Sequence, residues 1–260
     1  MKKIKLLLCL FILTTLCGCS NSNKNKSSKT LNAAMFWIST SLDPTNNYDG
    51  WVLSRIGVGE TLLKLNEKYE VEPSLAKSYE QIDDTTWKLT LKDSITFSNG
   101  KKVTGENVKA CLERAFEKNT RAIDYFDLNH VEAKGQDIYL YLNKSSGAIL
   151  NNLCEPLFTI YDASQSEEDI ANNPLCTGPF VVDDFVSEKT IDTSKNKKYY
   201  DGKAKLDHVH FSQVADSDAR VLALQSGEVD LANTIDYSSL KLFRNNKNYH
   251  VLEVLGPRTN

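Results

Sequence analysis

The first thirty residues restrict where this chain can build a folded body. Lys2, Lys3 and Lys5 precede an apolar stretch, residues 6–16, which is far shorter than the roughly 20 residues that a membrane-spanning helix needs. A basic start followed by a short apolar stretch is typical of a secretion signal. Residues 20–30 are polar and rich in lysine, asparagine and serine, as in a solvated linker. We therefore expect a folded body over residues 31–260, located outside the cytoplasm.

The end of the apolar stretch carries a candidate attachment site. Leu16-Cys17-Gly18-Cys19 resembles a bacterial lipobox, in which the final cysteine is acylated and becomes the new N-terminus. This resemblance implies a signal peptide over residues 1–18, followed by a lipidated Cys19 and a polar linker over residues 19–30. Palmitate or a related acyl chain on Cys19 would then anchor the protein to the cell membrane, at the cell surface or in a periplasm. The alternative is an ordinary cleaved signal that happens to contain cysteines.

Charge and cysteine content exclude some kinds of partner. The formal net charge of −3, with both signs interspersed, provides no basic field for a nucleic acid. Of six cysteines, three lie beyond residue 19, and none has the CxxC spacing of a metal site. Cys111 lies on the apolar face of a predicted helix and is expected in the core. Cys154 and Cys176 are candidates for a disulfide, but spacing alone does not establish connectivity.

The body reads as α+β, with strands dominating. Residues 87–91 and 138–142 alternate or run apolar over strand length and predict two strands of a half-buried sheet. Two helices are also predicted. Thr104 can cap the first, whose apolar positions recur at three- and four-residue spacing at Val108, Cys111, Leu112, Ala115 and Phe116. The second has Ser217 or Asp218 as its N-cap and Gly227 as its C-cap. Further strands are expected at residues 180–185, 190–193, 208–212, 229–231 and 250–255.

Two glycine-containing turns are interpreted as scaffold and not as ligand contacts. Ser98-Asn99-Gly100 places a residue tolerant of positive φ before one that prefers it, which predicts a tight turn. Thr177-Gly178-Pro179 combines a free φ with a fixed one, which suits a turn that aims the next strand. Turn chemistry alone explains both segments.

Several short motifs occur in an order that carries a family resemblance. They are Leu42-Asp43-Pro44, Gly59-Glu60-Thr61-Leu62-Leu63, Pro73-Ser74-Leu75-Ala76, Trp87-Lys88-Leu89-Thr90-Leu91, Ile95-Thr96-Phe97-Ser98-Asn99-Gly100, Thr177-Gly178-Pro179-Phe180 and Ala223-Leu224-Gln225-Ser226-Gly227-Glu228-Val229-Asp230. With these motifs in this order, the chain resembles the extracellular solute-binding proteins of family 5, the peptide- and nickel-binding receptors of ABC importers. The resemblance extends from residue 31 to the last residue.

The resemblance implies a fold and a function. The fold would be the type II clamp of periplasmic binding proteins, of which residues 31–260 form the N-terminal lobe with its inserted subdomain. Members are usually about twice as long, so the second lobe is expected to be missing. The implied function is capture of a peptide or a nickel chelate by a monomeric lipoprotein, with delivery to membrane permease subunits and without a cofactor. A lipid-tethered sensor or chaperone-like binding protein is the alternative. No hydrolase or phosphate-loop motif occurs in the sequence, so we do not expect an enzyme.

Six residues are candidates for ligand contact. Tyr48, Trp51 and Arg55 combine flat apolar faces with a directed charge in a segment that borders the cleft in similar proteins. Arg121 and Tyr125 match only in part an arginine and a tryptophan of nickel-binding relatives. Glu155 stands where those relatives have a second arginine, which would favour a cationic group on the ligand. The alternatives are that Trp51 lies in the core, and that Arg55 and Glu155 face solvent.

His208 and His210 alternate along a predicted strand and would point to one side of a sheet, a spacing that can chelate a metal. Asp207 is the nearest acidic residue, but it is one position out of phase. We therefore assign no metal site.

Overall fold

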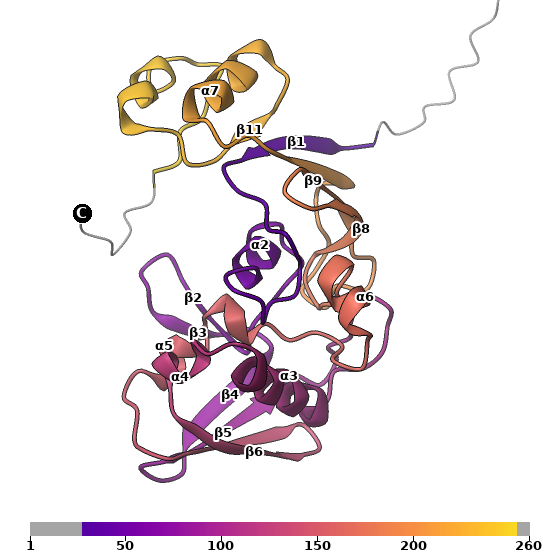
Figure 1. Ribbon diagram of the computed structural model, residues 1–260, viewed down its shortest axis with the longest axis vertical. Coiled ribbons are helices and arrows are strands. Elements are labelled where there is room, and N and C mark those ends of the chain that lie inside the picture. Colours follow the sequence, from indigo (N-terminus) through magenta and orange to yellow (C-terminus); the bar gives the residue numbers. More distant parts are fainter. Residues whose placement is uncertain (1–27, 254–260) are drawn as a thin grey trace, which may run out of the picture.

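A computed structural model describes residues 28–253, which form two larger sheets, a two-stranded hairpin and the helices around them (Figure 1). The predicted signal peptide and Cys19 lie outside these residues. The first sheet has the strand order β11 (Leu231–Ala232), β1 (Thr30–Met35), β10 (His208–Gln213), β9 (Thr190–Lys195) and β8 (Phe180–Val186). Strand β1 runs parallel to β10 and β11, whereas β10, β9 and β8 pair antiparallel.

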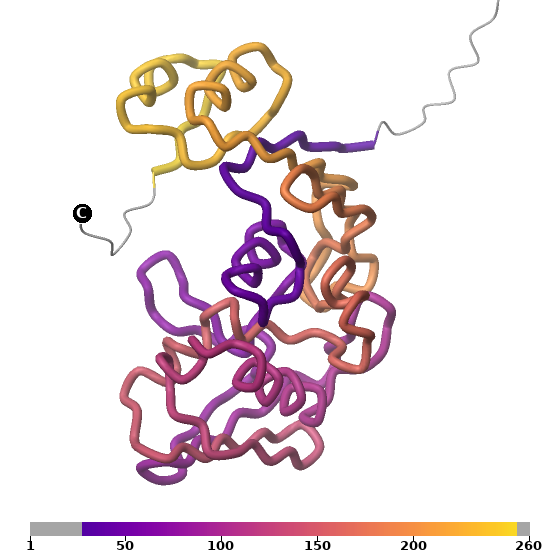
Figure 2. The backbone as a smooth tube through the Cα atoms, viewed as in Figure 1, coloured from indigo at the N-terminus to yellow at the C-terminus, as the bar shows by residue number. Residues whose placement is uncertain are grey.

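The second sheet is antiparallel and is covered by a helix. Its order is β4 (Ala76–Gln81), β5 (Thr86–Leu91), β7 (Asp137–Leu142) and β6 (Leu128–Lys134). Helix α3 (Gly105–Lys118) packs against β6 and β7, and a short hairpin of β2 (Leu63–Leu65) and β3 (Val71–Pro73) precedes the sheet. The chain leaves the first sheet after β1 and returns to it only at β8, so the second sheet belongs to an inserted subdomain (Figure 2). The expected α+β lobe with an insertion is confirmed.

Short helices fill the space between and beside the sheets. They are α2 (Gly50–Arg55), α4 (Ala122–Tyr125), α5 (Ile149–Asn152), α6 (Glu167–Asn172) and α7 (Ser217–Ser226), with the 3₁₀ helices η1 (Pro156–Phe158) and η2 (Tyr237–Leu242). Within the described residues, no helix has both the length and the apolar character needed to cross a membrane.

Helix α3 forms as its sequence predicts. The Thr104 hydroxyl accepts a hydrogen bond from the Asn107 backbone, and the Asn107 side chain accepts one from the Thr104 backbone, which satisfies two N-terminal donors. The buried face contains Val108, Cys111, Leu112 and Ala115. The predicted strands at 87–91 and 138–142 are β5 and β7, which pair directly in the second sheet.

Two boundaries differ from the predictions, and a third agrees with them. Helix α7 is capped by Asp216 and not by Ser217 or Asp218, because the Asp216 carboxylate accepts from the Ala219 N–H at 2.8 Å. Gly227 ends this helix with a φ of 78°, as predicted. The next strand begins at Leu231, two residues later than predicted.

The strand expected at residues 250–255 is wrong over residues 250–253, the part that the structure describes. Leu252 is 80% exposed, and no neighbouring strand pairs with these described residues. An apolar pattern without a pairing edge does not make a strand.

The two glycine turns form for different reasons. Gly100 has a φ of 92° and donates its N–H to the Phe97 carbonyl at 2.7 Å, which closes the predicted tight turn. Gly178 is needed for close approach and not for a free φ. A Cβ there would lie 2.5 Å from the carbonyl oxygens of Gly57 and Val58. The Gly178 N–H donates to the Val58 carbonyl at 3.0 Å, and strand β8 starts two residues later.

The cysteines of the described part are free thiols: Cys111, Cys154 and Cys176. The disulfide considered between Cys154 and Cys176 is therefore absent from this structure. Cys111 is buried in the core, as expected, and burial raises the pKa of its thiol to about 12.

Candidate functional site

The six predicted ligand residues lie in one cluster, although they come from three separate segments. Tyr48 precedes α2, and Trp51 and Arg55 lie within it. Arg121 is the N-cap of α4, which follows α3, and Tyr125 is the last residue of that helix. Glu155 precedes η1. Helix α2 lies between the two sheets in Figure 1. The cluster therefore sits where the first sheet meets the inserted subdomain.

The segment that carries Tyr48 is held in place by helix α3. Arg114 donates to both carboxylate oxygens of Asp43, at 2.9 and 2.7 Å, and to the Thr45 hydroxyl at 2.6 Å. Asn119, at the end of the same helix, donates to the carbonyls of Thr45 and Asn47 at 3.1 Å. These bonds order the loop before α2.

A close backbone approach brings Trp51 to Glu155. A Cβ on Gly50 would lie 2.3 Å from the Pro156 carbonyl oxygen, so only glycine lets α2 pack this closely on η1. The Trp51 indole N–H then donates to the Glu155 carboxylate at 2.8 Å. The Glu155 side chain is 16% exposed, which contradicts the alternative that this carboxylate faces solvent. Trp51 remains 36% exposed and is not a core residue.

Arg121 joins the other members of the cluster. It donates to the Asn47 carbonyl at 2.9 Å and to the Tyr125 hydroxyl at 2.7 Å. Its guanidinium lies over the ring of Tyr48, 3.7 Å from the ring centre, in a cation–π contact. A guanidinium nitrogen is 4.0 Å from the Glu155 carboxylate, which is at the limit of an ion pair. Arg121 is therefore oriented by neutral groups and only loosely neutralised.

Arg55 occupies the edge of the cluster. Its guanidinium lies 5.5 Å from the centre of the Trp51 ring and 5.4 Å from that of Phe36. Tyr48, on the other side, is 54% exposed. The arrangement presents aromatic faces with a cation and a carboxylate between them. Such a surface can stack on flat ligand groups and orient opposite charges on one ligand.

Burial changes the acidity of groups in and next to the cluster. Burial raises the pKa of Asp49 to about 6; a hydrogen bond from Asn46 opposes this shift and the nearby Asp43 charge adds to it. Burial also raises the pKa of Tyr125 to about 12, with the Glu155 charge acting in the same direction. Tyr125 therefore stays a neutral hydroxyl near Arg121 and Glu155.

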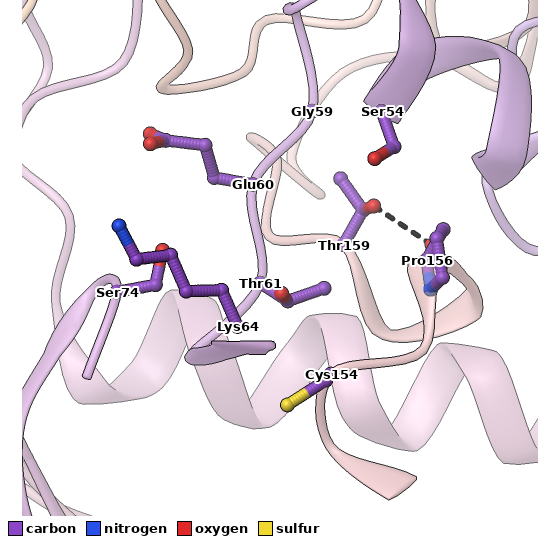
Figure 3. Close-up of a pocket in the computed structure, with 9 residues that line it drawn as sticks. All are labelled: Ser54, Gly59, Glu60, Thr61, Lys64, Ser74, Cys154, Pro156 and Thr159. Carbon is purple, nitrogen blue, oxygen red and sulfur yellow. Dashed lines mark hydrogen bonds between the residues drawn. The ribbon is translucent and has the colours of Figure 1, made fainter. Parts of the chain in front are cut away.

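A cavity of about 150 Å³ borders the cluster (Figure 3). Ser54 follows Trp51 by three positions in α2, and Cys154 and Pro156 flank Glu155 in sequence. Hydroxyl groups dominate the lining, which also includes a carboxylate, a lysine and a thiol: Ser54, Gly59, Glu60, Thr61, Lys64, Ser74, Cys154, Pro156 and Thr159. Burial raises the pKa of the Cys154 thiol to about 11, so this thiol stays protonated near neutral pH.

Glu60 is a half-buried hydrogen-bond hub that is not among the predicted site residues. Its carboxylate accepts from the hydroxyls of Thr177, Tyr199 and Tyr200 at 2.7, 3.2 and 3.1 Å. Burial raises its pKa, and these hydroxyls oppose the shift. Its motif was noted only as part of the family pattern, and nothing local in the sequence marks partners that lie more than 100 positions away.

The two histidines of β10 have separate acidic partners. His210 Nδ1 lies 2.7 Å from an Asp192 carboxylate oxygen, and His208 Nδ1 lies 4.0 Å from Asp183. Over residues 28–253, no group of three or more His, Cys, Asp or Glu side chains is placed to hold a metal ion.

Comparison with known proteins gives a consistent set of similarities. The model of the family "bacterial extracellular solute-binding proteins, family 5 Middle" matches residues 70–260. The nickel-binding protein NikA of Staphylococcus aureus is 33% identical over 244 residues, covering 94% of this chain and 48% of NikA. The glutathione-binding protein GsiB of Escherichia coli is 28% identical over 201 residues, covering 74% of this chain and 39% of GsiB.

A solved structure agrees in fold. The crystal structure of S. aureus NikA in complex with Ni(L-His)2 superposes with a TM-score of 0.79 at 32% identity, covering 85% of this chain and 46% of that one. The chain thus spans less than half the length of each of these proteins.

Proposed function

Because the chain belongs to the bacterial extracellular solute-binding proteins of family 5, we propose that it takes part in capturing a small solute outside the membrane for an ABC importer. The observation that carries this proposal is the convergence of Tyr48, Trp51, Arg55, Arg121, Tyr125 and Glu155 on one partly exposed surface. Capture requires neither a cofactor nor covalent chemistry, and the role is binding and not catalysis.

The charges of the cluster favour a ligand with both an acidic and a basic group. Arg121 can bind a carboxylate, and Glu155 can accept from an amine at the other end of the same ligand. The aromatic faces of Tyr48 and Trp51 can pack against the part between them. Peptides have this character, and amino-acid chelates of nickel offer carboxylates together with amine N–H donors. GsiB is named for glutathione, which is a peptide, and NikA was solved in complex with Ni(L-His)2.

Capture would be coupled to transport through closure. In the two-lobed clamp that the family resemblance implies, a ligand that binds the closed form more tightly than the open form would shift the equilibrium toward closure of this lobe against a second one, and the permease would recognise the closed shape. Acylation at Cys19 would keep this monomeric receptor at the outer face of the membrane. A lipid-tethered sensor would use the same binding surface without a permease, and adjacent permease and ATPase genes would distinguish the importer from it.

Isothermal titration with two ligand sets tests this proposal. One set contains Ni²⁺ with L-histidine, and the other contains glutathione and unmodified tripeptides. We expect saturable binding to one set, weakened at least tenfold by Glu155→Gln, because the lost negative charge no longer attracts the amine. Glu117→Gln, at an exposed position on α3, is the matched control and should bind as the wild type does. Absence of saturable heat with both sets, or equal effects of the two substitutions, would contradict the proposal.

A further inference from the structure

The loop between β9 and β10 carries a concentration of lysines. Over residues 196–207 the exposed side chains include Lys197, Lys198, Lys203 and Lys205. The two acidic residues of this loop are Asp201 and Asp207. Asp207 forms an ion pair with Lys195 and accepts from the Lys29 backbone N–H at 3.0 Å. The exposed part of the loop is therefore strongly basic, although the whole chain has a formal net charge of −3.

The protein body holds this loop in place. The Asn196 N–H donates to the Pro179 carbonyl at 2.8 Å, and the Tyr199 and Tyr200 hydroxyls donate to the Glu60 carboxylate. Lys198 donates to the Asn99 carbonyl at 2.6 Å. The first part of the loop, residues 196–200, is thus anchored to the body, which reduces the backbone entropy lost when the loop meets a charged surface.

The loop ends where the described chain begins. The N–H groups of Asp207 and His208 both donate to the Lys29 carbonyl, at 2.8 and 3.2 Å, and Thr30 pairs with His208 in the first sheet. The loop and the start of β1 lie toward the same side of the view in Figure 2. Lysines 24, 26 and 29 precede β1, and no Asp or Glu occurs before Asp43. The sequence that leads toward Cys19 is therefore basic as well.

We propose that this lysine loop, residues 196–207, contacts the anionic phospholipid headgroups of the membrane to which Cys19 is attached. The inference rests on the attachment that forms part of the proposed function. Lys29 lies ten positions after Cys19, and a fully extended chain of that length spans no more than about 35 Å. The face that bears Lys29 and the loop is therefore kept near the lipid surface. Clustered lysines near such a surface are attracted by its negative potential.

The consequence is an orientation of the body. A flexible linker alone would let the body rotate freely above the membrane. Contact at the lysine loop turns the face that bears Lys29 and this loop toward the lipid. None of the six cluster residues belongs to the loop, so the contact does not use the surface proposed for solute. The lysine loop thus supplies a second attachment to the membrane, of the kind that polybasic patches provide beside an acyl chain.

Vesicle binding by the full chain with Cys19→Ser tests this contact without an acyl group. Partition is measured by co-sedimentation with vesicles of 30% phosphatidylglycerol in phosphatidylcholine, and with pure phosphatidylcholine as the baseline, at about 0.1 M salt, where screening is moderate. We expect stronger binding to the anionic vesicles. A triple variant with Lys197→Glu, Lys203→Glu and Lys205→Glu should lose this preference for anionic vesicles by about tenfold or more. A thermal melt of the triple variant shows that it remains folded.

A matched triple substitution separates position from net charge. The control variant carries Lys68→Glu, Lys241→Glu and Lys247→Glu, which change the net charge by the same amount at exposed lysines outside the lysine loop. Its partition to vesicles should stay within about twofold of the wild type. Equal binding to the two kinds of vesicle, or equal losses in the two triple variants, would overturn the proposal. Solute titration of the loop variant should match that of the wild type. Vesicle partition is a separate readout, so a failure of solute binding does not affect it.

Discussion

Two arginines of the inserted subdomain reach the same segment, residues 43–49, but they are bound differently. Arg114 is 11% exposed and donates at short range to Asp43, Thr45 and the Tyr161 hydroxyl, with a further ion pair to Glu167. Arg121 is 27% exposed, bonds to a carbonyl and a tyrosine hydroxyl, and lies 4.0 Å from its acidic neighbour. The first arginine has its charge matched within the protein, whereas the second retains capacity for an external anion.

The two aspartates of this segment show the same contrast. Burial alone would raise both pKa values. Hydrogen bonds from Arg114 and Thr45 outweigh burial at Asp43 and lower its pKa, whereas Asp49 has only an amide donor from Asn46 and its pKa rises to about 6. A charge partner therefore decides whether a buried carboxylate here supports the fold or opposes it.

Loss of Arg114 is expected to have the largest effect on stability. Arg114→Ala leaves the Asp43 carboxylate buried without its partner, which should lower the free energy of unfolding by about 3–5 kcal/mol. Urea denaturation followed by circular dichroism measures this. Lys109→Ala on the same helix removes only a 3.9 Å pair with Glu113 and should cost no more than about 0.5 kcal/mol. Similar losses for both variants would contradict the distinction between the two arginines.

The contact between α2 and η1 should be the next most sensitive. Gly50→Ala forces a methyl group against the Pro156 carbonyl and should destabilise the protein by about 1–3 kcal/mol. The same shift separates Trp51 from Glu155, so solute affinity should fall as well. Gly147→Ala is the control, because no atom lies within 4 Å of the added Cβ. If Gly50→Ala left both stability and affinity unchanged, the close approach would not be what assembles the cluster.

Asp49 should produce a pH dependence opposite to that of Asp43. The folded-state pKa of Asp49 is about 6, above the unfolded value of 3.8, so Asp49 lowers stability as pH rises from about 4 to about 6. Asp49→Asn should therefore stabilise the protein by about 1–3 kcal/mol at pH 7 and have little effect below pH 4. Asp43 has a lowered pKa, and its contribution is lost as pH falls below about 4. Urea midpoints measured from pH 3 to pH 8 check both signs, and a stabilisation by Asp49→Asn that persists unchanged at pH 3 would contradict the assignment.

Local patterns were sufficient for much of the fold. The Thr104 cap and the apolar spacing of α3 lie within one stretch of sequence, and β5 and β7 show their alternation directly. The expected strand near the C-terminus was wrong over residues 250–253 because a strand also requires a partner edge. The N-cap of α7 was misplaced by a residue or more because Ser217, Asp218 and Asp216 can all cap, and only geometry selects Asp216.

The composition of the cluster could be predicted more readily than its geometry. The six residues were chosen for their chemistry and for a family resemblance, but the bond from Trp51 to Glu155 joins positions 104 apart. It depends on the packing of Gly50 against Pro156, which no local pattern reveals. The same reason explains why Glu60 and the Asp43–Arg114 pair were not anticipated as hubs. A single charged residue in a sequence does not indicate its distant partner.

The most direct test of the central claim measures stability and solute affinity together in Arg121→Ala. Since Arg121 is only loosely paired, its removal should lower the free energy of unfolding by no more than about 1 kcal/mol. Affinity for the solute identified by titration should fall at least tenfold, because a charged hydrogen bond to the ligand is lost. Lys118→Ala, at the end of the neighbouring helix, is the control for charge and should change neither quantity by more than a small amount. An Arg121→Ala protein that binds solute as tightly as the wild type, or that loses as much stability as Arg114→Ala, would contradict the account.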